Sequence, residues 1–430
     1  MATWAIGASQ LGGLDIGASQ GGTITYTSTA SQPSKEQMVW LSHTTDYDNF
    51  REGVKDGDAF SISVPTTNEI RWVEALEALL VGTSGDEWKI GTNDLDTPLT
   101  PTNFSVKQQT NYGCKDIQAV KVNDAILFID FVGRKIRELT YDDSVRKYVA
   151  PDMTSLAEHI TLSGIVCYAH QKNPDSILWC VLDDGSLISM TYDREQNVVA
   201  WAKQIIDGDV ESVAIIPGTT EDEVWISVKR TINSADVRCI EQMQPRNFGT
   251  DLEDCFFVDC GLTTTAPAGS ITLAHLVGET VSILADGVVM DSAVVGAGGT
   301  TAVKLNGVVT NATVVQAGLP YTYKLEPMRP DVSGPGGTSH SSKVHVAKMG
   351  ISFLDTMNAK YGTSDSELFD IDWTASDWKN NSDITGLFTG DVVVSVDGGF
   401  TLDNNLIISG NDPLPCTVRA IVPRLDITGD

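Results

Sequence analysis

The side chains that most often carry chemistry are few and scattered in this chain. Its six histidines never fall at i, i+2 or i, i+4 spacing, and the closest two, His340 and His345, are five residues apart. That spacing suits no common metal motif. We therefore predict neither a catalytic nor a metal-binding role for the histidines.

Carboxylates are abundant, so a pair of them carries little information. Four lie close together in the sequence beside Trp373: Asp365, Glu367, Asp370 and Asp372. This cluster is either a weak calcium site or a solvated acidic loop, and we favour the loop. The acidic stretches at 46–48 and 56–58 resemble parts of calcium loops but lack a Glu at the twelfth position.

The motifs of the common enzyme classes are missing. The sequence contains no Gly-x-Ser-x-Gly elbow, no P-loop and no Gly-x-Gly-x-x-Gly following a strand. Of the seven cysteines only Cys255 and Cys260 are close together, and no histidine or second cysteine pair completes a zinc pattern. We therefore predict reduced thiols, no catalytic residue, no metal site and no cofactor, and we expect the chain not to be an enzyme.

A strand-turn-strand pattern recurs four times in the first half of the chain. The repeats open at Leu79, Ala125, Ile177 and Glu223, in steps of 46, 52 and 46 residues. A strand repeat of roughly 40 to 50 residues is typical of propeller blades. The predicted fold is all-β: a propeller-like body of repeated four-stranded blades, an inserted small β-barrel or sandwich, and a C-terminal β region.

Tryptophans in or beside the predicted strands are expected to form the blade core. The residues assigned this role are Trp88, Trp179 and Trp225. A sugar-stacking platform is the alternative role for such side chains.

Changes in composition divide the chain into four parts. We predict an N-terminal arm at 1–37, a blade region at 38–250, a small β-barrel insertion at 251–330 and a C-terminal β region completing the body at 331–430. Four blades are fewer than most closed propellers contain. Either the C-terminal segment or another chain supplies the rest.

One short helix is predicted inside the blade region. The apolar residues Ile70, Val73 and Leu76 recur at a spacing of three, which favours one face of a helix over 67–76. A strand is the alternative.

The charge balance is strongly acidic, with 57 Asp and Glu against 29 Lys and Arg and a formal net charge of −28. This argues against a surface that grips nucleic acid by neutralising phosphates. It allows a surface past which DNA slides. The start Met1-Ala-Thr-Trp4 has neither a basic start nor a long apolar run, so we expect no signal peptide, and no segment is apolar enough for a membrane helix.

Several segments together resemble the tail nozzle (tail tubular protein B) family of short-tailed bacteriophages. They begin at Trp40-Leu-Ser-His-Thr-Thr-Asp-Tyr-Asp-Asn-Phe50 and include 80–88, 108–113, 133–141, 174–179, 187–196, 211–217, 242–246, 257–262, 276–281, 411–415 and 419–423. Family members usually carry a substantial region before the segment that begins here at Trp40. A compact nozzle or a separate chain that completes it are the two alternatives.

The resemblance implies a virion protein located in the tail and assembled in the host cytoplasm. Copies would form a ring, six-fold by the resemblance, around a channel for double-stranded DNA in transit without specific binding. Tail adaptor and fibre or plug proteins are the implied partners. Candidate acidic positions facing the bore are Asp183, Asp184, Glu221, Asp222 and Glu223. The alternatives are a glycan-binding propeller for host recognition and a propeller glycosidase or lyase.

Overall fold

The computed structural model describes most of the chain. The described residues are 35–92, 97–249, 251–265, 269–330, 333–334, 337–338, 343–373, 386–396, 399–401 and 405–427. The arm predicted at 1–37 lies outside them except for its last three residues. Contacts divide the chain into two compact units: residues 1–203 with 212–222, and residues 204–211 with 223–430.

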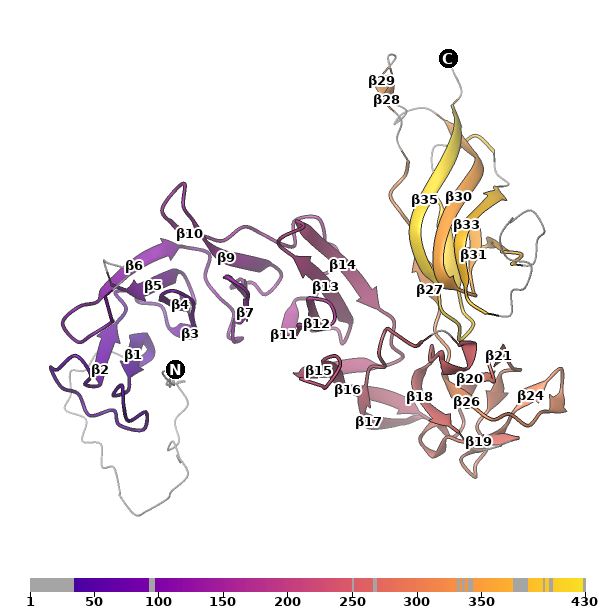
Figure 1. Ribbon diagram of the computed structural model, residues 1–430, viewed down its shortest axis with the longest axis horizontal. Coiled ribbons are helices and arrows are strands. Elements are labelled where there is room, and N and C mark those ends of the chain that lie inside the picture. Colours follow the sequence, from indigo (N-terminus) through magenta and orange to yellow (C-terminus); the bar gives the residue numbers. More distant parts are fainter. Residues whose placement is uncertain are drawn as a thin grey trace. The chain divides into compact units, whose positions relative to one another are not determined.

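The fold is all-β and propeller-like, as predicted (Figure 1). In the described ranges the helical elements are three 3-10 turns: η1 (Lys35–Gln37), η2 (Leu252–Asp254) and η3 (Ala274–Leu276). No helix in these ranges is long and apolar enough to cross a bilayer.

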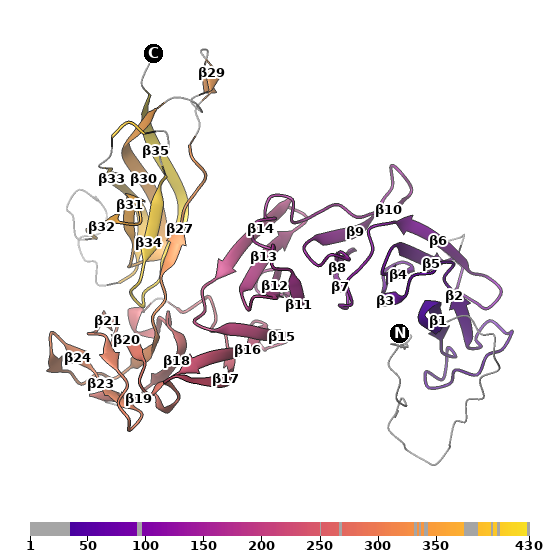
Figure 2. The ribbon, with the colours of Figure 1, turned by 180° about the vertical axis from the view of Figure 1, so that it is seen from behind.

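Unit 1 contains three four-stranded antiparallel sheets that follow one another along the chain (Figures 1 and 2). The first consists of β3 (Ile70–Ala75), β4 (Leu79–Thr83), β5 (Glu87–Gly91) and β6 (Ser105–Thr110). The second consists of β7 (Val120–Val122), β8 (Ala125–Ile129), β9 (Ile136–Asp142) and β10 (Lys147–Val149). The third consists of β11 (Ile165–Gln171), β12 (Ile177–Leu182), β13 (Leu187–Asp193) and β14 (Val198–Gln204).

The four predicted repeat starts are confirmed. Leu79, Ala125 and Ile177 begin β4, β8 and β12, and Glu223 begins β16 (Glu223–Ile232). The more polar partner strand of each repeat is also present, as β5, β9, β13 and β17 (Ala235–Gln242). The apolar runs therefore mark the buried strand of each sheet.

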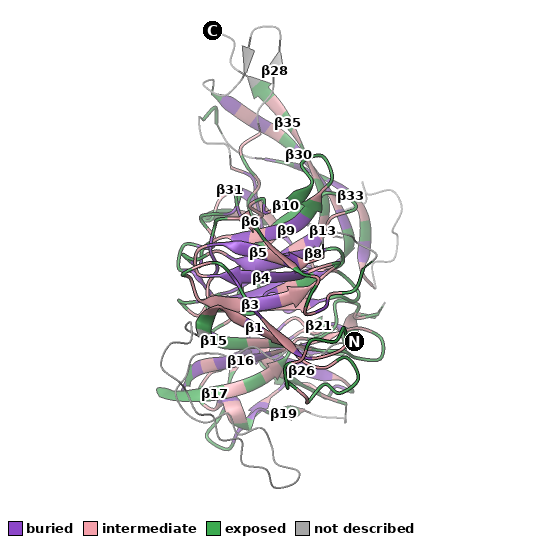
Figure 3. Cartoon of the chain, turned by 90° about the vertical axis from the view of Figure 1, so that its left-hand side faces the viewer, coloured by how far each residue is buried: buried purple, intermediate pink, exposed green. Residues whose placement is uncertain are grey.

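The sheets of unit 1 pack face to face because their central strands are apolar on both faces. In β8, Ile126 and Phe128 join a core with Trp72 of β3 and Leu80 of β4. The alternate residues of β8 point to the other side, where they share a core with β11, β12 and β13. A two-stranded sheet of β1 (Met38–Leu41) and β2 (Phe60–Ser63) covers the far face of the first blade. Figure 3 shows the buried residues along β4 and β5.

The helix predicted over 67–76 is wrong. Residues 70–75 form β3, an edge strand paired with β4. The register shifts between Ile70 and Trp72, and such a bulge interrupts strict alternation. The bulge places Ile70 and Val73 against the same core although they are three residues apart, whereas Leu76 follows the strand and packs against the other core.

Unit 2 begins with the hairpin of β16 and β17, whose sheet has the order β15-β16-β17. The boundary between the units falls inside β15 (Asp209–Ile216). A small β-structure with its own core follows. Its strands are β18 (Asp259–Thr264), β19 (Ser270–Thr272), β20 (Thr280–Ala285), β21 (Val288–Val289), β22 (Ala293–Val294), β23 (Thr300–Ala302), β24 (Lys304–Leu305), β25 (Val308–Val309) and β26 (Val315–Leu319).

The C-terminal strands form a two-sheet sandwich rather than further blades. One sheet has the order β27-β34-β31-β32 and the other β33-β30-β35, and a single core lies between them. The strands are β27 (Tyr323–Leu325), β30 (Val344–Thr356), β31 (Lys360–Ser364), β32 (Glu367–Asp370), β33 (Phe388–Ser395), β34 (Ile407–Gly410) and β35 (Thr417–Ile427), with β28 (Ser333–Gly334) and β29 (Gly337–Thr338) forming a separate hairpin. The acidic cluster lies in the turn after β31, on β32 and just beyond it, and Asp365 and Asp370 pair with Lys324 and Lys360.

Candidate functional site

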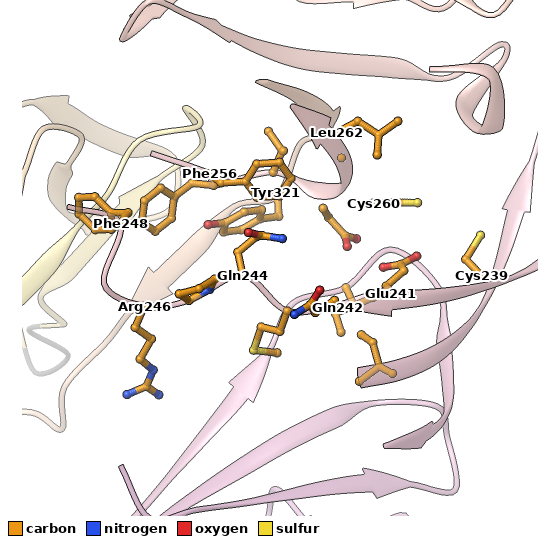
Figure 4. A pocket seen from close by; sticks show the side chains of 18 of the residues that line it. Cys239, Glu241, Gln242, Gln244, Arg246, Phe248, Phe256, Cys260, Leu262 and Tyr321 are labelled. Carbon is orange, nitrogen blue, oxygen red and sulfur yellow. The ribbon is translucent and has the colours of Figure 1, made fainter. Parts of the chain in front are cut away.

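A pocket with a volume of about 1140 Å³ lies within unit 2. It is bounded by β17, the segment that follows β17, the start of β18 and the side chains of His275 and Tyr321. Figure 4 shows aromatic residues gathered at one end and two cysteines with a glutamate at the other. The two ends differ enough in chemistry to be described in turn.

The register of the hairpin places the polar end of the pocket. Val228 pairs with Cys239 and Ile226 with Glu241, so these four residues share one face of the hairpin. Arg230 follows on that same face because side chains alternate along a strand. Cys239 and Glu241 therefore point in the same direction, toward the side from which β18 approaches.

A bulge at the start of β18 brings a second cysteine to this face. Asp259 pairs with Leu319 and Leu262 with Ala317, with an irregular register between them. Cys260, inside the bulge, has a φ of 49°, the left-handed conformation that non-glycine residues seldom adopt. The ring nitrogen Nε2 of His275 donates a hydrogen bond of 2.8 Å to the carbonyl oxygen of Cys260. This hydrogen bond ties the bulge to η3, which contains His275.

The donor atoms of Cys239, Glu241 and Cys260 all lie within 4.8 Å of one another. They are close enough for one ion to contact all three. Burial, with the nearby Glu241 carboxylate adding to it, raises the pKa of Cys260 above its usual value. Without an ion the Cys260 sulfur is therefore a protonated thiol at neutral pH.

A buried guanidinium organises the carboxylates beside this group. The Arg230 side chain is 1% exposed and donates to both oxygens of Glu241 and both oxygens of Asp259. Burial lowers the pKa of Arg230, but hydrogen bonds to Glu241 and Asp259 outweigh it and raise that pKa above its usual value. One positive charge thus faces two negative charges, which leaves a formal charge of −1.

The aromatic end of the pocket contains the faces and edges of several rings. Phe248 and Phe257 pack edge to face at 5.4 Å, and Figure 4 shows Phe256 and Tyr321 beside Phe248. The amide side chains of Gln242 and Gln244 lie between the aromatic end and the cysteines. Burial, with Asp259 adding to it, raises the pKa of Tyr321 to about 12, so its hydroxyl is neutral. Rings and amides of this kind suit a ligand with apolar faces and hydroxyl groups.

The residues predicted to face a bore divide into two groups. Asp183 and Asp184 lie exposed in the turn between β12 and β13, where the backbone N–H of Ser186 lowers the pKa of Asp184. Glu221, Asp222 and Glu223 are only partly exposed.

Two residues of the second group have partners within their own unit. Asp222 accepts the backbone N–H groups of Lys172 and Asn173 at 2.7 and 2.9 Å. Glu223 accepts the indole N–H of Trp225 at 2.9 Å. Asp183 and Asp184 are therefore the more accessible of the predicted charges, and whether any of the five faces a bore stays a prediction.

The three tryptophans assigned to the blade core differ in burial. Trp88 and Trp179 are buried, and the indole N–H of Trp179 donates to the side-chain oxygen of Gln171 at 2.9 Å. Trp225 is only partly buried, because it lies on the opposite face of β16 from the buried Val224, Ile226 and Val228 series.

Sequence reasoning missed the Cys239–Glu241–Cys260 group and predicted no metal site. It considered Cys255 and Cys260 because they are near in sequence, but the Cys255 Sγ lies against the carbonyl oxygen of Asp251. The useful signal was the Cys-x-Glu spacing at 239–241, which places two donors on one strand face. The position of Cys260 beside Cys239 and Glu241 depends on the bulge in β18, which no local sequence pattern predicts.

Comparison with known proteins identifies no family. No protein-family model matches the chain, and no curated protein matches it in sequence. Among solved structures, this chain shows a distant similarity to a luciferin-regenerating enzyme, with 13% sequence identity and a TM-score of 0.24 over 50% of this chain and 90% of that one. Another is an exo-beta-1,3-galactanase from Phanerochaete chrysosporium, with 10% sequence identity and a TM-score of 0.21 over 84% of this chain and 97% of that one. A third is a glycoside hydrolase family 43 arabinoxylan arabinofuranohydrolase from Bacillus subtilis, with 10% sequence identity and a TM-score of 0.21 over 84% of this chain and 95% of that one.

These neighbours correct one prediction from the sequence. All three are enzymes, which contradicts the expectation that the chain is not one, and the missing motifs do not exclude catalysis. At these TM-scores the likeness assigns no activity. The all-β, propeller-like fold is shown by the strands and sheets of the structure itself.

Proposed function

We propose that this chain is a structural subunit of the tail nozzle of a short-tailed bacteriophage, and that several copies form a ring through which the genome leaves. The family resemblance of the segments from Trp40 to 419–423 supports this role. It also gives the virion tail as the location and makes adaptor, fibre or plug proteins the expected neighbours.

The structural observation that best supports the role is the short run of blades in unit 1. It holds three four-stranded sheets, whereas closed propellers typically have four to eight. Each sheet packs on the next, and the run does not close within the unit. An open run of this kind suits a wall segment of a larger assembly.

An apolar patch on unit 1 is a candidate contact with another copy. Phe131 and Val132 lie in the turn between β8 and β9, and Leu156 and Leu162 lie in the segment after β10. A hydrogen bond joins these two segments: Lys135 Nζ donates to the carboxylate of Glu158 at 2.9 Å. All four apolar residues are more than half exposed, Leu156 by 94%. Exposed apolar residues in adjoining segments are typical of interaction sites.

The charge is compatible with a conduit. The chain carries −28, and a ring multiplies this value by its copy number. If part of that charge faces the bore, the wall repels DNA phosphates and DNA passes without long pauses. Asp183 and Asp184 are the exposed candidates in unit 1.

Native mass spectrometry with negative-stain imaging tests the proposal. We expect a particle of several copies with a central hole. Leu156→Ser should reduce the ring fraction, whereas Val54→Ser, at a position 83% exposed outside the patch, should not. Asp183→Asn should leave ring formation nearly intact. A chain that stays monomeric at high concentration contradicts self-assembly of a ring.

The aromatic pocket of unit 2 favours a second candidate function, glycan binding. Phe248, Phe256 and Tyr321 offer ring surfaces, and Gln242 and Gln244 offer hydrogen bonds. A glycan array tests it: binding by the monomer that Phe256→Ala abolishes, with Phe104→Ala as control, supports this candidate over the first. Turnover of a bound glycan would favour the propeller glycosidase or lyase.

A further inference from the structure

We propose that Cys239, Glu241 and Cys260 form a binding site for one divalent cation of the zinc class. The site lies inside unit 2 and does not depend on a role in a phage tail. Its three donor atoms already lie within 4.8 Å of one another. In a tetrahedral zinc site with metal–sulfur distances of about 2.3 Å, donors are roughly 3.5 to 3.8 Å apart. Small side-chain rotations close that difference.

The donor set selects the class of metal. Two sulfur atoms and one carboxylate oxygen are typical ligands of zinc, whereas calcium and magnesium prefer oxygen ligands only. Three protein ligands leave one tetrahedral position open. The three residues line the pocket, so the open position is available to a water molecule or a ligand in the pocket.

The surrounding charges favour a divalent cation. Arg230, Glu241 and Asp259 together carry a formal charge of −1. A divalent cation placed beside this negative charge is stabilised by it.

Neighbouring groups already hold the ligands in place. Glu241 accepts two hydrogen bonds of 2.7 Å from Arg230, and its remaining lone pairs are free of that side chain. His275 fixes the backbone of the bulge through the carbonyl of Cys260. Hydrogen bonds that orient metal ligands from behind are usual in protein metal sites. Cys260 has a left-handed φ of 49°, and its sulfur lies within 4.8 Å of the donor atoms of Cys239 and Glu241 on β17.

Metal binding would join β17 to β18 through a short bridge. We expect zinc to raise the unfolding temperature of the full chain by about 3 °C when present at roughly 100 times its dissociation constant. A chelator should reverse the shift. Calcium and magnesium should have no such effect.

The experiment measures metal content and metal spectroscopy on the full-length reduced protein. After dialysis against zinc and then buffer, we expect about one zinc per chain. With cobalt in place of zinc, we expect a thiolate-to-cobalt charge-transfer band. Cys239→Ser and Cys260→Ser should each abolish the band, and Glu241→Gln should weaken it. Cys167→Ser, at a half-buried cysteine in unit 1, is the matched control and should retain both metal and band.

Several results would overturn the site. One is a wild-type protein that shows neither stoichiometric zinc nor the cobalt band. This result does not depend on whether any variant folds. Another is unchanged binding in Cys239→Ser and Cys260→Ser. A third is a Cys239–Cys260 disulfide found by peptide mapping of the protein purified under reducing conditions. His275→Asn should weaken binding by about 10- to 100-fold while leaving the cobalt band in position.

Discussion

Arg230 on β16 and Asp259 on β18 form a two-point ion pair, with Nη1–Oδ2 and Nη2–Oδ1 distances of 2.8 and 2.7 Å. The same guanidinium binds Glu241 of β17, so one buried cation connects three strands. Buried charges of this kind are tolerated only while every partner is present. Removing the cation leaves two carboxylates facing each other with little water.

We predict that Arg230→Met destabilises the protein by about 3 to 5 kcal/mol. The measurement is urea unfolding followed by fluorescence. Arg238→Met is the matched control, because Arg238 of β17 pairs with Glu211 of β15 but its side chain is 68% exposed. The control should cost no more than about 1 kcal/mol. Equal costs for the two variants would show that the burial of Arg230 is not what matters.

Gly82 is predicted to tolerate no side chain. A Cβ at this position of β4 would lie 2.1 Å from Cε2 of Trp72, which is fully buried between the first and second blades. Gly82→Ala should therefore cost about 1 to 3 kcal/mol through displacement of the ring. Gly298→Ala, where nothing lies within 4 Å of the new Cβ, should change stability by less than about 0.5 kcal/mol. Thermal unfolding of Gly82→Ala and Gly298→Ala tests this difference in stability.

Trp179 and Trp225 should respond differently to truncation. Trp179 is 2% exposed and hydrogen-bonded to Gln171, so Trp179→Ala should cost about 3 to 5 kcal/mol and prevent assembly of any ring. Trp225→Ala should cost clearly less, because its ring is partly exposed. Denaturant unfolding and native mass spectrometry check the two effects. Normal folding of Trp179→Ala would remove that residue from the blade core.

His170 should make unit 1 sensitive to acid. Burial, with Lys172 adding to it, lowers the pKa of His170 to about 4 from 6.5. Between these values the unfolded chain binds a proton that the folded chain does not, so stability is full above pH 6.5 and falls as the pH falls toward 4. After allowance for partial exposure we expect a loss of roughly 1 to 2 kcal/mol.

The check on His170 is unfolding of wild type and His170→Gln at a series of pH values. Glutamine can still hydrogen-bond to Ser176, the present partner of the His170 ring at 3.0 Å. The variant should show a flatter dependence of unfolding free energy on pH between 6.5 and 4. Parallel curves would assign the acid sensitivity to other groups.

The sequence predicted the positions of the strands well, but it did not predict which segments pack against them. The apolar runs at 79, 125 and 177 predicted β4, β8 and β12 because a strand buried on both faces is largely apolar, whereas β16, which begins at 223, is buried only at alternate residues. The β3 strand was mistaken for a helix because a bulge changed its period. Both results follow from local geometry.

The candidate site was missed because its parts come from separate strands. Cys239 and Cys260 meet only through the bulge of β18 and the register of the β16–β17 hairpin. Neither the bulge nor the register is marked by a short sequence motif of the kind that marks a tight turn. The exclusion of enzyme activity from missing motifs failed for a related reason, since active sites are defined by side-chain geometry and not by one motif.

The burial pattern of the third blade has a consequence for its local opening. Every residue of β12 is buried, whereas β14 at the edge of the same sheet is mostly exposed. Amide hydrogens exchange through local openings whose free energy follows burial and contact density. In hydrogen exchange, β12 should therefore be among the last segments to take up deuterium and β14 among the first. The edge strand can separate and return while the centre of the blade stays closed.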